Sequence, residues 1–328
     1  MKRALRGTVT AGLLVGVGFL VLRRDGAEDL LARLLAADGA WMLAAFGLHF
    51  VAVLLGTFRW SALLRSVDVR LPLDWLLRTY FAGRFVGAYT PSTVGLDVFR
   101  MVRVARRTGD RSRPASILLS EKLIGFVGLA LLSALLLPMG VVDAFGSKVA
   151  YLTLGLFVIS SIGLVALGQV RRFRGTFDRF GGRLGSGLRS LVRGLHAPRL
   201  GRQGWAGNIL LAFLSHLATS LVFVATARAL SIDVDASTLV AVGNAIVLAT
   251  LLPVSIGGIG VREGVAVVLL GLAGVSPADA TLVAFAGYLL GQGPALVGGA
   301  VLLAEMVPAS DLQPEKLGDP LVANAPFS

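Results

Sequence analysis

The chain lacks cysteine altogether, which excludes disulfide bonds, thiolate chemistry and any metal site built on cysteine. Histidine is scarce as well. The three histidines, His49, His196 and His216, do not show the HxxxH or HExxH spacing with which a helix binds a metal ion. The sequence also has no glycine-rich P-loop for a nucleotide. We therefore predict that the protein uses neither a metal ion nor a cofactor.

Charged residues make up only 15% of the 328 positions, whereas 55% are hydrophobic, and the mean hydropathy is +0.79. Several apolar runs approach the roughly 20 residues that a helix needs to cross a bilayer. A membrane β-barrel would show alternating polar and apolar residues instead. We predict an all-α polytopic membrane protein with about six full spans. The apolar runs cover residues 8–22, 40–58, 117–137, 149–169, 205–230 and 280–305.

The ends of two apolar runs carry further information. The first run, 8–22, is interpreted as a retained span and not as a signal peptide, because no Ala-x-Ala cleavage site follows it. Before the last run, the sequence SerProAlaAsp at 276–279 offers a serine N-cap followed by a proline, which favours the start of a helix there.

Acidic residues are few: 19 of them face 31 lysines and arginines, giving a formal net charge of +12. The arginines concentrate between the apolar runs, as they do in the cytoplasmic loops of membrane proteins. Residues 171–202 hold nine arginines and one acid, and they predict a cytoplasmic loop over 171–204. No basic stripe interleaved with aromatic residues is present, so we expect no nucleic-acid partner. We expect the protein in the cytoplasmic membrane, with both termini in the cytoplasm.

A polar motif occurs twice within apolar sequence, half the chain apart. In each copy a glycine follows a proline by four residues and an arginine follows the proline by nine: Pro91, Gly95 and Arg100 in the first, and Pro253, Gly257 and Arg262 in the second. Proline and glycine interrupt a helix. A charged group at membrane depth costs roughly 2.5–3.5 kcal/mol, so it is kept mainly where it serves a function. We predict two broken or re-entrant helical segments, with Pro91 and Pro253 as the structural helix breaks.

Three predicted spans separate the two motifs, so the motifs enter the membrane from opposite sides. Inverted repeats with discontinuous helices are common in secondary transporters, where the helix breaks meet at the substrate site. We therefore predict that the two broken segments are related as an inverted repeat. Residues 1–307 form a single integral-membrane domain in this interpretation, and the polar segment 308–328 is a disordered tail.

The residues of the two motifs suit an anionic headgroup. Four glycines allow backbone N–H groups to approach a ligand closely. Arg100 and Arg262 carry planar guanidinium groups that fit phosphate oxygens. Close helix packing is an alternative role for Gly260, and snorkelling to the membrane interface is an alternative for Arg100. The four glycines are Gly95, Gly257, Gly258 and Gly260.

Three acids, Asp97, Glu121 and Glu263, are predicted to lie at membrane depth. They either pair with the arginines, which makes a charged cavity tolerable, or one of them accepts a proton during transport. The sequence leaves both roles open.

Three segments together resemble the lysylphosphatidylglycerol synthase transmembrane, or flippase-like, family, and the likeness covers nearly the whole chain. They are GlyLeuAspValPheArg at 95–100, GluLysLeuIleGly at 121–125 and GlyValArgGluGly at 260–264. Leu96 replaces the second glycine of the first family motif, and Lys122 replaces the arginine of the second. The resemblance implies a flippase-like membrane domain. Two-domain relatives add a soluble acyltransferase-like domain, which this sequence lacks, so we expect no aminoacyl transfer by this chain alone.

Three functions are compatible with these observations. The first is a lipid flippase that moves an anionic phospholipid or lipid-linked precursor across the membrane. The second is a membrane transferase acting on a lipid phosphate, such as a polyprenyl-phosphate sugar, with Asp97 or Glu263 as general base. The third is an accessory subunit that binds a separately encoded lipid-modifying enzyme through the basic loop. The absence of a catalytic constellation favours the flippase over an enzyme; the lipid, the energy source and the oligomeric state remain open.

Overall fold

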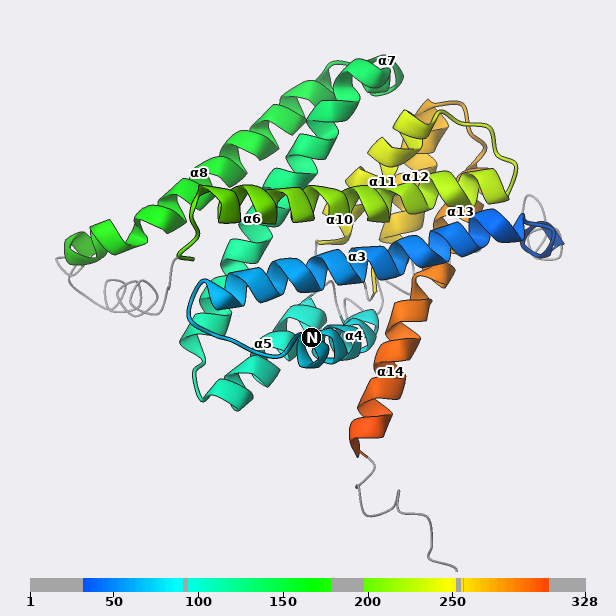
Figure 1. Cartoon of the computed structure of the whole chain (residues 1–328). Coiled ribbons are helices and arrows are strands. Elements are labelled where there is room, and N and C mark those ends of the chain that lie inside the picture. The colour runs from blue at the N-terminus through cyan, green and yellow to red at the C-terminus, as the bar shows by residue number, and fades with distance from the viewer. Residues whose placement is uncertain (1–31, 91–93, 178–197, 252–254, 256, 307–328) are drawn as a thin grey trace, which may run out of the picture.

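The computed structural model describes residues 32–90, 94–177, 198–251, 255 and 257–306, and all regular structure in these ranges is helical (Figure 1). The first half contains α3 (Gly39–Arg65), α4 (Leu73–Ala88), α5 (Val94–Thr108), α6 (Ser112–Leu136), the 3-10 helix η1 (Leu137–Met139), α7 (Val141–Phe145) and α8 (Lys148–Phe177). The second half contains α10 (Arg202–Ala229), α11 (Ala236–Thr250), α12 (Val261–Leu272), α13 (Pro277–Leu290) and α14 (Gln292–Met306).

Within the described ranges, four helical stretches are long and apolar enough to cross a membrane: Gly39–Arg65, Ser112–Met139, Arg202–Ala229 and Pro277–Glu305. Large apolar side chains such as Leu43, Leu210 and Leu296 are exposed on them, as lipid-facing residues are. The predicted class, an all-helical polytopic membrane protein, is confirmed. The predicted total of six spans stays a prediction.

Several predicted features lie outside the described residues. They are the first span 8–22, most of the basic loop 171–204, the tail 308–328, and both predicted helix-breaking prolines, Pro91 and Pro253. The part of the basic loop that is described begins as helix, because α8 continues to Phe177, beyond the predicted end of the span at 169.

Side-chain caps fix the starts of two spans. The Asp38 carboxylate accepts hydrogen bonds from the backbone N–H groups of Ala40 (2.8 Å) and Trp41 (3.1 Å) at the start of α3. At the start of α13, the Ser276 hydroxyl accepts from the Asp279 backbone N–H at 3.1 Å, and a proline follows Ser276 in the first turn. The predicted serine cap is therefore confirmed.

The last predicted span, 280–305, is not one continuous helix. It divides at Gly291 into α13 and α14 (Figure 1). His49 of α3 packs closely against Gly291. A Cβ at this position would come within 2.9 Å of the His49 ring. The stretch Pro277–Glu305 as a whole is still long and apolar enough to cross a membrane, as the sequence predicted.

The antiparallel pair of α3 and α10 lies at the centre of the molecule (Figure 1). The Asp38 backbone N–H, before α3, donates to the carbonyl oxygen of Ala229 at the end of α10 (2.9 Å). At the other end of the pair, the Arg199 N–H donates to the carbonyl oxygen of Ser66 (3.1 Å). Helix α10 also contacts α6, α11 and α13, whereas α4 packs against α14 and α5.

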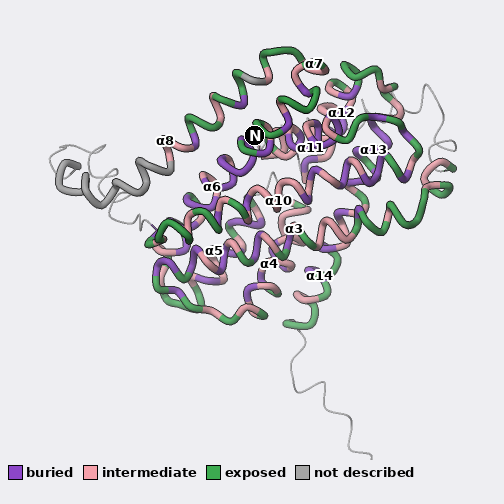
Figure 2. The backbone as a smooth tube through the Cα atoms, turned by 45° about the horizontal axis from the view of Figure 1, so that its top comes forward, coloured by how far each residue is buried: buried purple, intermediate pink, exposed green. Residues whose placement is uncertain are grey.

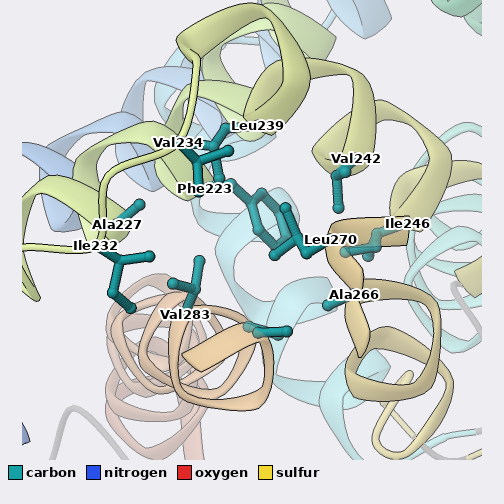
Figure 3. Packing of buried hydrophobic residues seen from close by; sticks show 12 residues of the cluster. Phe223, Ala227, Ile232, Val234, Leu239, Val242, Ile246, Ala266, Leu270 and Val283 are labelled. Atoms are coloured by element: carbon teal, nitrogen blue, oxygen red, sulfur yellow. The ribbon is translucent and has the colours of Figure 1, made fainter. Parts of the chain in front are cut away.

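Apolar packing holds the second half together where α10, α11, α12 and α13 meet (Figure 3). Leu239, Leu270 and Val283 are fully buried there. Figure 2 shows the contrast with α8, whose described side chains are mostly exposed. The buried centre of the molecule is thus built around α10, and α8 lies outside it.

The helix is interrupted at both copies of the repeated motif. Helix α4 ends at Ala88 and α5 begins at Val94; α11 ends at Thr250 and α12 begins at Val261. Both predicted breaks therefore fall between helices. After the first break, α5 continues through the motif arginine, Arg100, to Thr108.

Candidate functional site

Both copies of the motif line one cavity of about 310 Å³. Volumes of roughly 300–1,000 Å³ are typical of small-molecule sites, so the space suits a headgroup better than a whole lipid. Helices α3, α4, α5, α6, α10, α11, α12, α13 and α14 all contribute to its wall. The motif residues in the wall are Leu96, Asp97 and Arg100 from the first copy and Gly257, Gly258 and Arg262 from the second.

Positive charge dominates the cavity. Among the described residues that line it, five carry a cationic group and two carry a carboxylate. A low-dielectric wall with an excess of one charge attracts ligands of the opposite charge. The cations are Arg59, Arg84, Arg100, Lys122 and Arg262, and the carboxylates are Asp97 and Glu121.

The two carboxylates form a closed cluster with three of the cations. Arg100 contacts Asp97 Oδ1 through Nη2 (2.7 Å) and both Glu121 oxygens through Nη1 and Nη2 (3.2 and 3.3 Å). Arg59 Nη2 donates to Glu121 Oε1 at 3.2 Å. Lys122 Nζ lies 2.6 Å from Asp97 Oδ2. Each of the four carboxylate oxygens therefore has a cationic partner, which makes these buried charges tolerable.

Two aromatic rings hold Arg100 in this cluster. Its guanidinium carbon lies 4.6 Å from the ring centroid of Tyr80 and 5.0 Å from that of Trp60. Only 3% of Arg100 is exposed. Snorkelling to the membrane interface, one of the two roles considered for Arg100, is therefore wrong. Arg100 does line the cavity, but its Nη atoms already bind carboxylates.

Arg262, in the first turn of α12, has no carboxylate partner in the part of the chain that the structure describes. Its Nη1 atom is shielded from solvent and makes no hydrogen bond within the described part of the chain. The guanidinium lies over the ring of Tyr288, 4.7 Å from the centroid. The neighbouring acid, Glu263, turns away: its Oε2 accepts from the Gly260 backbone N–H at 2.6 Å. Glu263 thus stabilises the start of α12.

Two further arginines carry buried donors without partners. Arg84 Nε and Arg59 Nε and Nη1 make no hydrogen bond among the described residues. Arg84 and Arg262 line the same cavity. His216 Nε2 also makes no hydrogen bond to a described residue, and both it and Arg59 Nη1 lie within 3.9 Å of the position that a Cβ would take at Gly125. Buried donors in this state call for an acceptor from a ligand or from water.

Two of the three histidines also line the cavity. His49 Nε2 donates to the carbonyl oxygen of Gly287 at 3.0 Å, since a carbonyl can only accept. The predicted site did not include Arg59 and Arg84, nor the two histidines. Arg84 could have been predicted as a site residue, because it is an arginine inside an apolar helical stretch.

The predicted glycines divide into two groups. Gly257 and Gly258 line the cavity, with φ angles of +61° and +78° that favour glycine. Gly95 lies outside it, and a Cβ there would overlap the side chain of Thr90. Gly260 precedes α12, and its backbone N–H donates to Glu263. Like Gly95, Gly260 does not line the cavity.

Comparison with known proteins is consistent with this architecture. No curated protein matches the chain. The model of one protein family, described as the lysylphosphatidylglycerol synthase TM region, matches residues 7–298, a range that includes the three segments at 95–100, 121–125 and 260–264 and every residue of the cavity wall. The chain therefore belongs to the lysylphosphatidylglycerol synthase TM region family.

Proposed function

We propose that this protein moves a lipid with an anionic headgroup across the cytoplasmic membrane, with the headgroup passing through the cavity between the two broken helices. The observation that carries this proposal is the set of buried guanidinium donors without partners, on Arg59, Arg84 and Arg262. Buried donors of this kind are costly unless an acceptor is supplied, and phosphate oxygens are strong acceptors for arginine.

An inverted repeat would explain how such a site opens to either side. The proposed equivalents are α3 and α10, α4 and α11, α5 and α12, and α6 and the pair α13–α14. The packing supports this assignment, because the contacts α3–α4, α4–α5, α5–α6 and α4–α14 have the counterparts α10–α11, α11–α12, α12–α13 and α11–α6. The equivalent helices α3 and α10 run antiparallel, as an inverted repeat requires.

The alternative function, a membrane transferase, needs a carboxylate that is free to act as general base. Asp97 binds Arg100 and Lys122, Glu121 binds Arg100 and Arg59, and Glu263 binds the backbone of Gly260. These contacts favour transport over catalysis. The accessory-subunit alternative rests on the basic loop, most of which lies outside the described residues.

The test is transport by purified protein in vesicles that contain phosphatidylglycerol with a fluorescent acyl chain, read by the fraction of label that a membrane-impermeant quencher reaches. We expect Arg84→Gln and Arg262→Gln each to slow transport about tenfold or more, because a hydrogen bond to a charged group contributes about 1.5–3 kcal/mol and 1.4 kcal/mol corresponds to tenfold.

The matched control is Arg199→Gln, since Arg199 lies outside the cavity in an exposed ion pair with Asp68. It should transport at the parental rate. Parental rates in both cavity variants would refute the proposal. A covalently altered lipid recovered from the vesicles would support the transferase instead.

A further inference from the structure

Three helices, α4, α5 and α14, pack more closely on one another than on the rest of the molecule. Helix α4 lies between α5 and α14 (Figure 1). Glycines bring the backbones together: a Cβ at Gly298 of α14 would overlap the carbonyl oxygen of Phe81 in α4, and a Cβ at Gly83 of α4 would come within 2.7 Å of Leu96 in α5. Packing of this closeness leaves the helices little room to shift against one another.

An ion pair also ties α5 to α14. Arg103 donates through Nη1 and Nη2 to the two carboxylate oxygens of Glu305, at 2.6 and 3.2 Å, although 202 positions separate these residues in the sequence. The Arg103 guanidinium lies 5.5 Å from the ring centroid of Trp75, in the first turn of α4. A bidentate pair fixes orientation as well as distance. One arginine therefore joins all three helices at the same end.

We call α4, α5 and α14 the three-helix unit. Three short segments connect it to the rest of the described chain: 66–72, 109–111 and Gly291. Helix α14 packs mainly against α4 of the unit and much less against α13, which precedes it in the chain. The first two segments contain residues with positive φ, Asp68 at +63° and Gly109 at +71°. Short connections at helix ends are the usual places for hinges.

The cavity lies between the three-helix unit and the other helices. Its wall takes Arg84, Asp97 and Ala295 from the unit, and Arg59 and Arg262 from the other helices. A movement of the unit against the other helices therefore opens or closes the cavity.

An apolar cluster at one end of the unit provides a pivot for such a movement. Leu76, in the first turn of α4, and Val104, near the end of α5, are fully buried there. They pack in one cluster with Leu63 of α3 and Ile117 of α6. Two of the three connecting segments, those before α4 and after α5, lie at the same end.

At the opposite end, the unit meets the loop before α12 across a long hydrogen bond. The Gly257 N–H donates to the carbonyl oxygen of Thr90 at 3.3 Å, which is longer than is usual for a bond of this type. Breaking it costs little when water or a ligand takes its place. The unit therefore separates most easily from the second half of the chain at this end.

The buried charge cluster spans the same boundary, and it is divided so that each side stays paired. Asp97 and Arg100 both belong to α5 and bind each other at 2.7 Å. Glu121 and Arg59 belong to the other side and bind each other at 3.2 Å. Movement breaks the bonds that Arg100 and Lys122 make across the boundary, but each carboxylate keeps an arginine. The movement therefore leaves neither buried carboxylate without a cation, which would be costly.

The corresponding helices of the second half are held more firmly. Under the proposed inverted repeat they are α11, α12 and α6. Helix α6 packs along α8 and α10, α11 packs along α10, and α12 packs along α13. These helices therefore belong to the larger body built around α3 and α10.

We propose that the three-helix unit is the moving part of this transporter: it swings about the buried contact of Leu76 and Val104 with α3 and α6, and the swing opens and closes the cavity. The inference rests on the proposed function and extends it, because it names the helices that move. Each swing breaks the Arg100–Glu121 contact and keeps the ion pairs within each body.

The chain has no cysteine, so pairs of cysteines can be introduced without background. The first pair, Phe50→Cys with Phe81→Cys, joins α3 to α4 across the boundary, where the two ring centroids lie 6.0 Å apart. The matched control within the unit is Phe85→Cys with Gly299→Cys, because a Cβ at Gly299 would come within 2.9 Å of the Phe85 ring. None of these four residues lines the cavity. A short bis-methanethiosulfonate reagent joins each pair, and dithiothreitol releases it.

Transport of fluorescent phosphatidylglycerol is measured before cross-linking, after it and after reduction. The cross-link between positions 50 and 81 should slow transport at least about tenfold, with recovery on reduction, because the unit can no longer swing. The cross-link between positions 85 and 299 should leave the rate within about twofold of its value before cross-linking, since both residues move together. Unchanged transport with the first cross-link, or loss of transport with the second, overturns the proposal.

Distances between spin labels detect the movement without a transport assay. Tyr89 at the end of α4, Val268 in α12 and Leu303 in α14 are exposed and lie outside the cavity wall. Double electron–electron resonance in phosphatidylglycerol nanodiscs should give two distances for labels at 89 and 268, which lie on different sides of the boundary. Labels at 89 and 303, within the unit, should give one. A single distance for both pairs overturns the proposal.

The two measurements separate this inference from the proposed function. Two distances between 89 and 268 in a protein that moves no lipid support the moving unit and refute transport. Transport that persists with the cross-link between 50 and 81 refutes the moving unit while the transport function stands. A cysteine pair that prevents folding shows no transport after reduction either, and the spin-label distances then decide.

Discussion

Gly257 donates its backbone N–H to the carbonyl oxygen of Thr90 across 3.3 Å, and this bond joins the two loops that carry the repeated motif. The contact is close, because a Cβ at Gly257 would come within 2.8 Å of the carbonyl oxygen of Ala88. The two halves of the chain therefore meet at the edge of the cavity through backbone atoms, and the geometry of the site depends on a residue without a side chain.

Replacement of this glycine should lower stability. Gly257→Ala combines a positive φ of +61° with a contact that the backbone of Ala88 cannot avoid, so we expect a loss of about 1–3 kcal/mol. Thermal unfolding of the purified protein in detergent measures it. Gly264→Ala is the matched control: a Cβ there meets nothing within 4 Å, and alanine favours a helix by about 1 kcal/mol. An equal loss in both variants would contradict the role of the loop contact.

Arg100 should contribute to the stability of the fold and not only to substrate binding. Arg100→Gln leaves Asp97 and Glu121 short of their main cation in a buried setting, and breaking a buried ion pair costs about 3–5 kcal/mol. We expect a large drop in the unfolding temperature. Arg106→Gln, at an exposed position of the same helix, should change stability by no more than about 0.5 kcal/mol. Similar unfolding temperatures for the two variants would show that the cluster contributes little.

The sequence predicted the parts of this site that depend on local pattern. Proline and glycine at fixed spacing indicated the two helix breaks, and arginine and aspartate at membrane depth indicated Arg100, Asp97 and Arg262 as site residues. It could not predict that Asp97 and Glu121 share Arg100, because that depends on how α5 packs against α6.

In two places the structure differs from the sequence prediction although the sequence itself indicated the observed structure. Glu263 was expected to pair with an arginine or to accept a proton, yet it stands three residues after Gly260 at the start of a helix, which is the spacing of a carboxylate that caps its own helix. The break at Gly291 falls in the sequence GlyGlnGlyPro at 291–294, a combination typical of a helix boundary.

The contact between Glu263 and Gly260 allows a test of the proton-acceptor role. Glu263→Gln keeps an oxygen that can accept from the Gly260 N–H, so we expect nearly parental transport and a loss of about 0.3–1 kcal/mol from the missing charge at the helix start. Glu263→Ala removes the acceptor and should cost about 0.5–2 kcal/mol. Transport that stops in Glu263→Gln while the protein remains folded would point to a titrating carboxylate instead.

The ring of Tyr288 should orient the Arg262 guanidinium group toward the headgroup. The guanidinium lies 4.7 Å from the ring centroid, and a cation–π contact contributes about 0.5–2 kcal/mol, which corresponds to a change of about 2-fold to 30-fold in affinity. Tyr288→Phe keeps the ring and should bind phosphatidylglycerol as the parent does, whereas Tyr288→Leu should bind it more weakly within that range. Native mass spectrometry of the protein with increasing phosphatidylglycerol measures both variants. If Tyr288→Phe weakens binding as much as Tyr288→Leu, the phenolic hydroxyl is the contributing group, and Arg262 is not positioned by the ring.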